Sequence, residues 1–173
     1  RTEKTRIVSV GRLAKQKGYD RLLDVVARLK GEGFGFELVL VGKGEEEENL
    51  KKQAENLGIS DCIEFAGFVE NPYKYMQSAD FLVFPSRAEG YSTVVTEAVI
   101  LGKPIVVSDC SGMREILGDS EYGIVTDSDE DLYNAVKGMI TDKSLRDDYA
   151  KKASIRAKDF SRVKRVEELT ELF

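Results

Sequence analysis

The segment FLVFPSRAEGYSTVVTEAVILGKPIVVS, residues 81–108, decides the fold. Its two ends, Phe81 to Pro85 and Ile105 to Ser108, are short and continuously apolar, as buried parallel strands are. Between them, Thr93 to Leu101 predicts a helix that the following Gly-Lys-Pro ends. A strand, a helix and a second strand in this order form the repeating unit of an α/β sheet.

The same alternation continues in both directions along the chain. Further strands are predicted by four apolar runs: Ile7 to Val10, Phe36 to Val41, Ile63 to Ala66 and Gly123 to Val125. Further helices are predicted by amphipathic segments: Tyr19 to Lys30, Glu45 to Leu57, Tyr73 to Ala79, Asp129 to Ile140 and Leu145 to Phe160, with a charged tail from Val163 to Phe173. We therefore expect one doubly wound, Rossmann-like α/β domain over residues 1–173, with a mainly parallel six-stranded sheet flanked by helices.

The composition fits this expectation and disfavours several classes of protein. A length of 173 residues favours one domain, and 42% hydrophobic residues are ample for a single core. The net charge is -5, from 26 basic and 31 acidic residues, and the basic residues are dispersed, which disfavours nucleic-acid binding. No apolar stretch approaches the roughly 18 residues of a membrane span, and the first residues, RTEKTR, do not resemble a signal peptide.

The histidine and cysteine content narrows the chemistry that the chain can perform and the cellular compartment in which it works. The chain has 0 His, so it lacks the usual general base and the commonest metal ligand. Cys62 and Cys110 lie far apart in the sequence, near predicted strands and without a CxxC spacing. We expect two small buried thiols in a reducing compartment, which favours a cytoplasmic protein.

Charged residues gather after two of the predicted strands. Gly11, Arg12 and Lys17 follow the first strand, and Glu89 and Glu97 flank the turn that leads from the fourth strand into a helix. In a doubly wound sheet, ligands bind beyond the carboxyl ends of the strands, where these residues fall. Cations suit a diphosphate and carboxylates suit hydroxyl groups, so the pattern predicts a nucleotide-sugar site.

Read together, these segments resemble the C-terminal, donor-binding domain of a family 4 (group 1) glycosyltransferase of the GT-B fold. The resemblance covers almost the whole chain. It rests on five motifs: GRLAKQKG at 11–18, LVLVGKG at 38–44, IEFAGFV at 63–69, ADFLVFPSRAEGYSTVVTEA at 79–98 and LGKPIVVSDCSGMREI at 101–116. It implies a retaining, hexosyltransferase-type parent enzyme that moves a sugar from a nucleoside diphosphate sugar to an acceptor hydroxyl in polysaccharide or glycoconjugate biosynthesis.

The resemblance also implies roles for individual residues. Arg12 and Lys17, beside Gly11, are expected to contact the donor diphosphate. Glu89, the first residue of the E-x7-E pair, is expected to approach the donor sugar as the catalytic residue, either at a hydroxyl or at the anomeric carbon. Glu97, the second residue of the pair, is expected to hold the ribose hydroxyls.

The helix N-terminus between the two glutamates adds an anion site. Unpaired N–H groups there, with the helix dipole, favour a phosphate. The amides are those of Gly90, Tyr91, Ser92 and Thr93. The hydroxyls of Ser92 and Thr93 are also good helix caps, a role compatible with phosphate binding. Because Arg12 and Lys17 can neutralise the departing diphosphate, we expect no metal ion and no cofactor apart from the donor.

Each assignment has a structural alternative. Arg12 and Lys17 are also explained as ordinary solvent-exposed cations of a surface loop. Glu97 is also explained by a structural salt bridge to Arg87. Glu89 is also explained as a residue of the turn before the helix. The base of the donor stays undetermined, because the family reads it largely through main-chain groups in loops such as 67–71.

The whole enzyme is expected to have an N-terminal domain that binds the acceptor, so this chain resembles half of it. Alone, the chain should bind donor nucleotide but transfer sugar poorly. The parent enzyme is expected in the cytoplasm, with peripheral membrane attachment left open.

Two other functions remain open. A nucleotide-sugar epimerase half would form an epimer without an acceptor, and a noncatalytic nucleotide-binding module would use the carboxylates structurally.

Three further patterns are interpreted as structural. Gly42-Lys43-Gly44 resembles the start of a dinucleotide fingerprint, but Glu47 stands at the third glycine position, and the four glutamates there suit a helix dipole instead. Asp127-Ser128-Asp129 resembles a D-x-D metal site, but it opens a predicted helix, where these residues cap and complement the dipole. Arg114 lies in a loop that enters a short helix and stays unassigned.

Overall fold

The computed structural model describes residues 4–171, with side chains described as far as Phe160. It contains a six-stranded sheet in the order β3-β2-β1-β4-β5-β6, and every neighbouring pair is parallel. The strands are β1 (Thr5–Val10), β2 (Phe36–Val41), β3 (Ile63–Gly67), β4 (Phe81–Phe84), β5 (Ile105–Ser108) and β6 (Ile124–Thr126). This order confirms the predicted doubly wound α/β domain.

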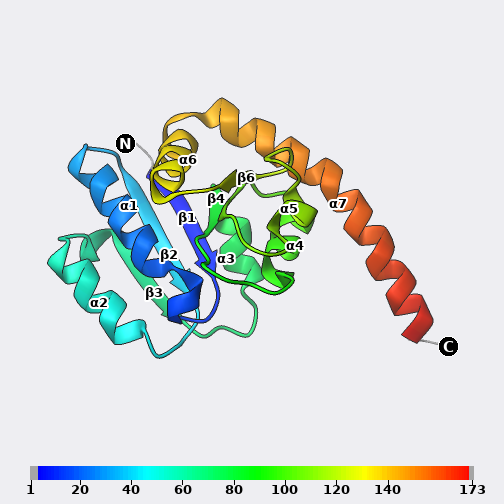
Figure 1. The fold of residues 1–173 in the computed structure, drawn as a ribbon, viewed down its shortest axis with the longest axis horizontal. Helices are drawn as coiled ribbons and strands as arrows, with labels where there is room; N and C mark the ends of the chain where they lie inside the picture. The colour runs from blue at the N-terminus through cyan, green and yellow to red at the C-terminus, as the bar shows by residue number, and fades with distance from the viewer. Residues whose placement is uncertain (1–3, 172–173) are drawn as a thin grey trace.

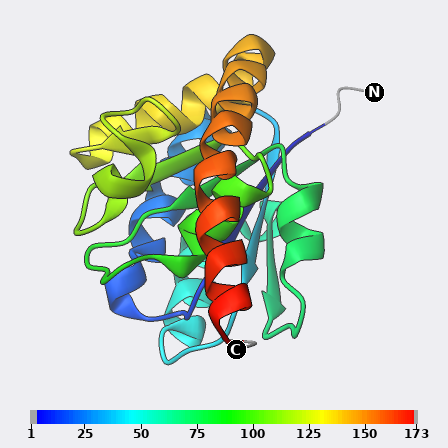
Figure 2. The ribbon, with the colours of Figure 1, turned by 90° about the vertical axis from the view of Figure 1, so that its right-hand side faces the viewer.

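Helices cover both faces of the sheet (Figure 1). One face packs against α1 (Tyr19–Gly31), α2 (Glu47–Asn56) and α6 (Asp129–Thr141). The other face packs against α3 (Tyr73–Ser78), α4 (Thr93–Ile100), α5 (Met113–Leu117) and α7 (Lys143–Glu171), and Figure 2 looks onto α7 as it crosses this face. None of the helices in residues 4–171 has both the length and the apolar character needed to cross a bilayer.

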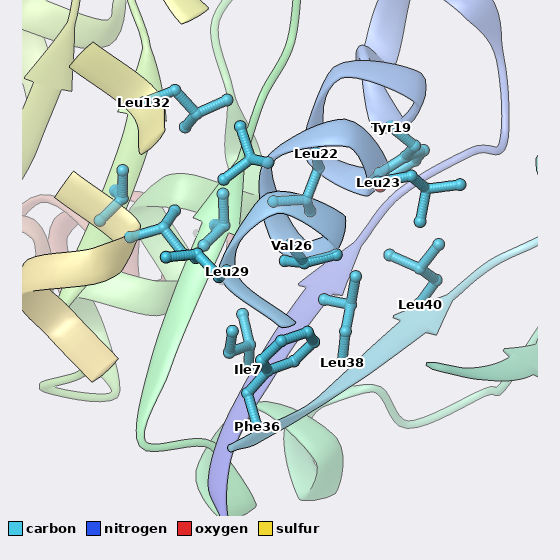
Figure 3. Close-up of a cluster of buried hydrophobic side chains, with 14 of the residues drawn as sticks. Ile7, Tyr19, Leu22, Leu23, Val26, Leu29, Phe36, Leu38, Leu40 and Leu132 are labelled. Atoms are coloured by element: carbon cyan, nitrogen blue, oxygen red, sulfur yellow. The ribbon is translucent and has the colours of Figure 1, made fainter. Parts of the chain in front are cut away.

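The central strands β2, β4 and β5 are mostly apolar because they bury both of their faces, whereas the edge strand β3 is only half-buried. In β2, Leu38 and Leu40 belong to the core under α1, whereas Val39 and Val41 belong to the core on the opposite face. Figure 3 shows the first of these cores, with Val26 of α1 lying over β1 and β2. Each of these aliphatic side chains is at most 2% exposed, and burying one contributes about 1.5–3 kcal/mol.

The C-terminal region differs from the sequence prediction. We expected a helix from Leu145 to Phe160 and a separate tail, whereas α7 is one continuous helix of 29 residues. The physical reason is the lack of Gly or Pro around Ser161, so nothing in the sequence ends the helix there. The amphipathic character predicted for Val163 to Phe173 lies outside the described side chains, and the last two residues lie outside the described chain.

The direction of winding reverses between β1 and β4, and the loops that leave these two strands are joined there. The backbone N–H of Arg87 donates to the carbonyl of Gln16 at 2.7 Å. The Arg87 guanidinium binds both oxygens of Asp20 at 2.6 Å, and this hydrogen bonding lowers the pKa of the Asp20 carboxyl. A Cβ on Gly18 would overlap the carbonyl of Pro85. The two loops therefore form one packed unit at the reversal point.

Close backbone packing between the two loops predicts that Gly18→Ala strongly lowers the free energy of unfolding. Gly18 and Gly58 both have a left-handed backbone, with φ of 71° and 70°, but a Cβ on Gly58 would meet open space. Gly58→Ala should lose about 1–2 kcal/mol of unfolding free energy from backbone strain alone. Gly18→Ala should lose about 1–3 kcal/mol more because the new methyl group collides with Pro85.

Equilibrium urea unfolding of the two variants measures the difference directly. Equal losses in both variants would show that the loops after β1 and β4 are not in close contact.

Candidate functional site

The contact between Lys17 and Glu89 lies where the loops after β1 and β4 meet. The Lys17 Nζ is 2.5 Å from the Glu89 Oε1, and the Ser86 hydroxyl donates to the same oxygen at 2.8 Å. The Lys17 and Glu89 side chains are 20% and 12% exposed. One cation and one carboxylate of the predicted site are thus in direct contact and mostly shielded from water.

The buried Tyr19 side chain accounts for the glycine at position 11. The Tyr19 side chain is 3% exposed, and a Cβ on Gly11 would stand 2.8 Å from its hydroxyl oxygen. Burial raises the pKa of Tyr19 to about 12, and the negative charge of Glu89 adds to the rise. Gly11 therefore leaves room for a buried, neutral phenol beneath the loop.

Arg12 has a different partner. Its Nη2 is 2.9 Å from the Glu45 Oε2, with side-chain exposures of 69% and 57%. An exposed pair of this kind contributes about 0–1 kcal/mol. Arg12 can therefore exchange Glu45 for another anion at little cost, whereas Lys17 is held more firmly.

A cavity of about 350 Å³ opens at the carboxyl ends of β1, β2 and β3. It is lined by Val10, Gly11, Arg12, Val41, Gly42, Lys43, Phe68, Val69 and Pro72. Phe68 is 70% exposed, which is unusual for a large aromatic side chain, and it forms part of an apolar wall. Among the residues with described side chains, Lys43 has no ion-pair partner. The cavity therefore combines an apolar surface with two cations, Arg12 and Lys43.

The glycines after β2 are explained by backbone packing. A Cβ on Gly42 would overlap the carbonyl of Gly11, and one on Gly44 would overlap the carbonyl of Leu13. Glu47 and Glu48 lie in the first turn of α2, where they complement the helix dipole as predicted. Backbone packing therefore accounts for Gly42 and Gly44, the two glycines that make this segment resemble a dinucleotide fingerprint.

The loop before α4 carries the predicted anion site. Ser92 is the N-cap of α4 and accepts a hydrogen bond from the Val95 N–H at 3.3 Å, which confirms its capping role. Thr93 is instead the first helical residue and is exposed. Gly90 is exposed as well, and no other atom lies within 4 Å of where its Cβ would be. Tyr91 is 59% exposed, so the start of this helix is open to solvent.

Glu97 is half-buried, and its side-chain partner was not predicted. The helix α4 buries only one side, through Val95, Ala98 and Val99, and Glu97 is half-buried. The Tyr73 hydroxyl donates to the Glu97 Oε1 at 2.9 Å. The salt bridge to Arg87 that we considered is not formed, because Arg87 binds Asp20.

Other sequence interpretations have clear outcomes. Ser128 caps α6 by accepting from the Asp131 N–H at 3.1 Å, and Asp129 lies in the first turn, as predicted. Asp127 does not cap the helix; it forms an ion pair with Arg114. Arg114 also binds Asp109 and Asp119, so it ties the ends of the β5–α5 and α5–β6 connections together. The two cysteines are free, but only Cys62 is buried; Cys110 is half-buried, so that part of the prediction was wrong.

Four residues that shape the candidate site were given no individual role from the sequence: Lys43, Phe68, Pro72 and Tyr73. Phe68 lies within the segment 67–71 that we expected to read the base, and an aromatic residue directly after a predicted strand was a usable signal for it. Lys43 was dismissed together with the fingerprint that contains it. Tyr73 carried no signal, because its contact with Glu97 joins residues that are 24 positions apart.

Comparison with known proteins identifies the family. The family model for glycosyl transferases group 1 matches residues 1–156. The chain belongs to the group 1 glycosyltransferases. It is 37% identical over 161 residues to the N-acetylgalactosamine-N,N'-diacetylbacillosaminyl-diphospho-undecaprenol 4-alpha-N-acetylgalactosaminyltransferase of Campylobacter jejuni, with 91% of this chain and 43% of that protein covered.

A second relative is also matched over most of this chain but less than half of its own length. The chain is 33% identical over 142 residues to the lipopolysaccharide core biosynthesis glycosyltransferase LpsE of Rhizobium meliloti, covering 81% of this chain and 41% of that protein. This group 1 chain therefore spans less than half the length of these curated relatives.

Two solved structures share the fold of this chain. HepE of Anabaena, in complex with UDP-glucose, superposes with a TM-score of 0.84 at 23% identity, covering 99% of this chain and 50% of that chain. WaaG, a glycosyltransferase involved in lipopolysaccharide biosynthesis, superposes with a TM-score of 0.80 at 24% identity, covering 91% of this chain and 44% of that chain. The expected fold, one half of a GT-B glycosyltransferase, is confirmed.

The shielded ion pair of this group 1 domain predicts energetic coupling between Lys17 and Glu89. Lys17→Met should lose about 1–3 kcal/mol of unfolding free energy, because it leaves the Glu89 carboxylate mostly buried without a cation. The double variant Lys17→Met, Glu89→Gln should recover at least about 1 kcal/mol of that loss. Chemical unfolding of the double-mutant cycle measures the coupling.

Arg12→Met provides the matched control and should cost less than about 1 kcal/mol, because the pair with Glu45 is exposed. Additive effects of the Lys17 and Glu89 substitutions would contradict the interpretation.

The buried phenol predicts a pH dependence of stability. The Tyr19 pKa is about 12 in the folded chain, against about 10 in an unfolded one, so the unfolded state loses this proton first. Stability is therefore fully present below about pH 10 and falls by about 2–3 kcal/mol as the pH rises towards 12. Unfolding free energies of the wild type and Tyr19→Phe, compared at several pH values, isolate this contribution. Parallel curves above pH 10 would show that the phenol titrates normally.

Proposed function

We propose that this chain is the donor-binding domain of a retaining glycosyltransferase that uses a nucleoside diphosphate sugar. The observation that carries the proposal is the Lys17–Glu89 contact between the loops after β1 and β4. Ligands of doubly wound sheets bind at this reversal of the strand order, beyond the carboxyl ends of the strands. A cation for phosphate and a carboxylate for a sugar therefore lie together where a nucleotide sugar would bind.

The diphosphate is assigned to cations from one loop and amides from another. Arg12 and Lys17 neutralise the charge that builds up on the nucleoside diphosphate as it leaves. The N-terminus of α4, where Gly90, Tyr91 and Thr93 are exposed and Ser92 is buried, adds backbone N–H groups and the positive end of the helix dipole. This set supplies positive charge from the chain itself, so the mechanism requires no metal ion.

The nucleoside is assigned to the cavity and to Glu97. The apolar wall of Phe68, Val69 and Pro72 suits the face of a base, and this loop overlaps the segment that we expected to read the base. Glu97 accepts hydrogen bonds from the ribose hydroxyls through its carboxylate.

Glu89 is assigned to the donor sugar. The Lys17 ammonium holds the carboxylate in place, so Glu89 can either bind a sugar hydroxyl or stabilise positive charge at the anomeric carbon. The acceptor hydroxyl then attacks the anomeric carbon on the face from which the nucleoside diphosphate departs, its proton passes to the departing diphosphate oxygen, and the configuration is retained, as the family resemblance implies.

The parent enzyme and its pathway are proposed from the relatives. Because the chain spans less than half of them, we propose that it works with a second domain that binds the acceptor. Relatives named for lipopolysaccharide core and amylovoran biosynthesis support a hexosyltransferase of polysaccharide or glycoconjugate synthesis in the cytoplasm. On its own the chain should transfer little sugar, and rapid turnover of a simple acceptor by this chain would contradict that view.

The proposed roles predict that binding losses depend on the ligand. Arg12→Ala should weaken the binding of both a nucleoside diphosphate and pyrophosphate, because both carry the phosphates. Glu97→Gln should weaken nucleoside diphosphate binding by about 10- to 100-fold through weaker charged hydrogen bonds, and leave pyrophosphate binding unchanged. Titration calorimetry with UDP, GDP, ADP and pyrophosphate measures each affinity.

Glu55→Gln is the matched control, because Glu55 is an exposed carboxylate on α2 away from the site. The proposal fails if none of the three nucleotides binds, or if Arg12→Ala and Glu97→Gln bind them as the control does.

A further inference from the structure

Tyr73 connects the cavity to the carboxylate assigned to the ribose, and an inference drawn from this contact rests on the proposed function. The Tyr73 hydroxyl donates to the Glu97 Oε1 at 2.9 Å, from the first residue of α3 to the middle of α4. Tyr73 is 41% exposed, so its ring is not a core residue. Core packing therefore does not explain why the Tyr73 hydroxyl donates a hydrogen bond to Glu97.

Glu97 depends on this hydrogen bond for its orientation. Among the residues with described side chains, no Lys or Arg lies within ion-pair distance of Glu97. A carboxylate has about four lone-pair sites, and Tyr73 occupies one of them. The remaining sites are enough for two hydroxyl hydrogens, so Tyr73 can hold the carboxylate while the ribose binds it.

The two helices do not need the Tyr73 hydroxyl to stay together. Met76 of α3 is fully buried in the core that α4 shares. At the other end of α3, the Lys103 ammonium, which follows α4, donates to the carbonyls of Gln77 at 2.6 Å and Ala79 at 3.0 Å. These contacts already fix α3 relative to α4, so the Tyr73 hydroxyl affects the carboxylate rather than the fold.

Tyr73 is also tied to the wall of the cavity. Its backbone N–H donates to the Asn71 Oδ1 at 3.1 Å, and the residue between them, Pro72, lines the cavity together with Phe68. The loop on the base side and the carboxylate on the ribose side are therefore linked through a single side chain. The hydrogen bond to the Glu97 carboxylate raises the pKa of Tyr73, so the hydroxyl stays a donor at neutral pH.

We propose that Tyr73 is a positioning residue for the nucleoside, which orients the Glu97 carboxylate towards the ribose hydroxyls from the loop that borders the base. It acts on the donor through Glu97. Recognition of the base and of the ribose is thereby coupled through one hydrogen bond.

The test replaces the hydroxyl and keeps the ring. Titration calorimetry compares wild type, Tyr73→Phe and Glu97→Gln with UDP, GDP and ADP, and then with the 2′,3′-dideoxy form of the nucleotide that binds best. Tyr73→Phe should weaken binding of the ribonucleotide about 3- to 10-fold, the loss expected of one hydrogen bond, and leave the dideoxy form within about 2-fold. In the Glu97→Gln background the same substitution should have a smaller effect.

Tyr75→Phe is the matched control. Tyr75 lies two residues further along α3, packs against the same core and makes no hydroxyl hydrogen bond within the described part of the chain. Tyr75→Phe should bind both forms of the nucleotide as the wild type does, and thermal unfolding should confirm that all four variants are folded.

The outcomes separate this inference from the proposed function. Equal losses for the ribonucleotide and its dideoxy form, tighter binding by Tyr73→Phe, or no loss in Tyr73→Phe while Glu97→Gln loses affinity would each overturn the positioning role alone. If no nucleotide binds the wild type, or if Glu97→Gln keeps full ribose selectivity, the proposed function fails and this inference fails with it.

Discussion

The reversal of winding between β1 and β4 is the constraint on which the rest of this structure depends. Because successive strands are added in opposite directions from this point, the loops after β1 and β4 leave the sheet as neighbours. Gly18 lets them approach until the backbones touch, and the bidentate pair of Arg87 and Asp20 holds them there. The site thus rests on backbone packing rather than on flexible side chains, which keeps its charged groups in place.

The two cations assigned to the diphosphate differ in how firmly the chain holds them. Lys17 is mostly shielded and binds Glu89, the carboxylate that we assign to the donor sugar, whereas Arg12 is exposed and binds Glu45, to which we assign no role. Moving Lys17 would leave Glu89 without its cation, so both groups are expected to act on the donor together. Arg12 can instead turn towards an arriving phosphate with little loss, since exposed ion pairs contribute about 0–1 kcal/mol.

The sequence predicted the strands well, because a strand buried on both faces is mostly apolar: β4 is apolar at every position, and Glu37 is the one polar residue of β2. It also located the cation loop and the glutamate pair, since both directly follow such strands. Helix ends were less well predicted: the continuity of α7 past Ser161 was missed because an amphipathic pattern can weaken without the helix ending. The cavity was missed as well, because its wall is assembled from three loops that are distant in the sequence.

The sequence by itself determined the fold class and the family, because periodicity and motif spacing are properties of residues that lie near one another in the chain. Only the tertiary structure decided which partner each charged residue takes. Lys17 and Glu89 are 72 positions apart, and Arg12 could have bound either glutamate of the predicted site rather than Glu45. Such choices depend on the order of the strands and on the few ångströms that separate competing partners, and no local pattern records either of them.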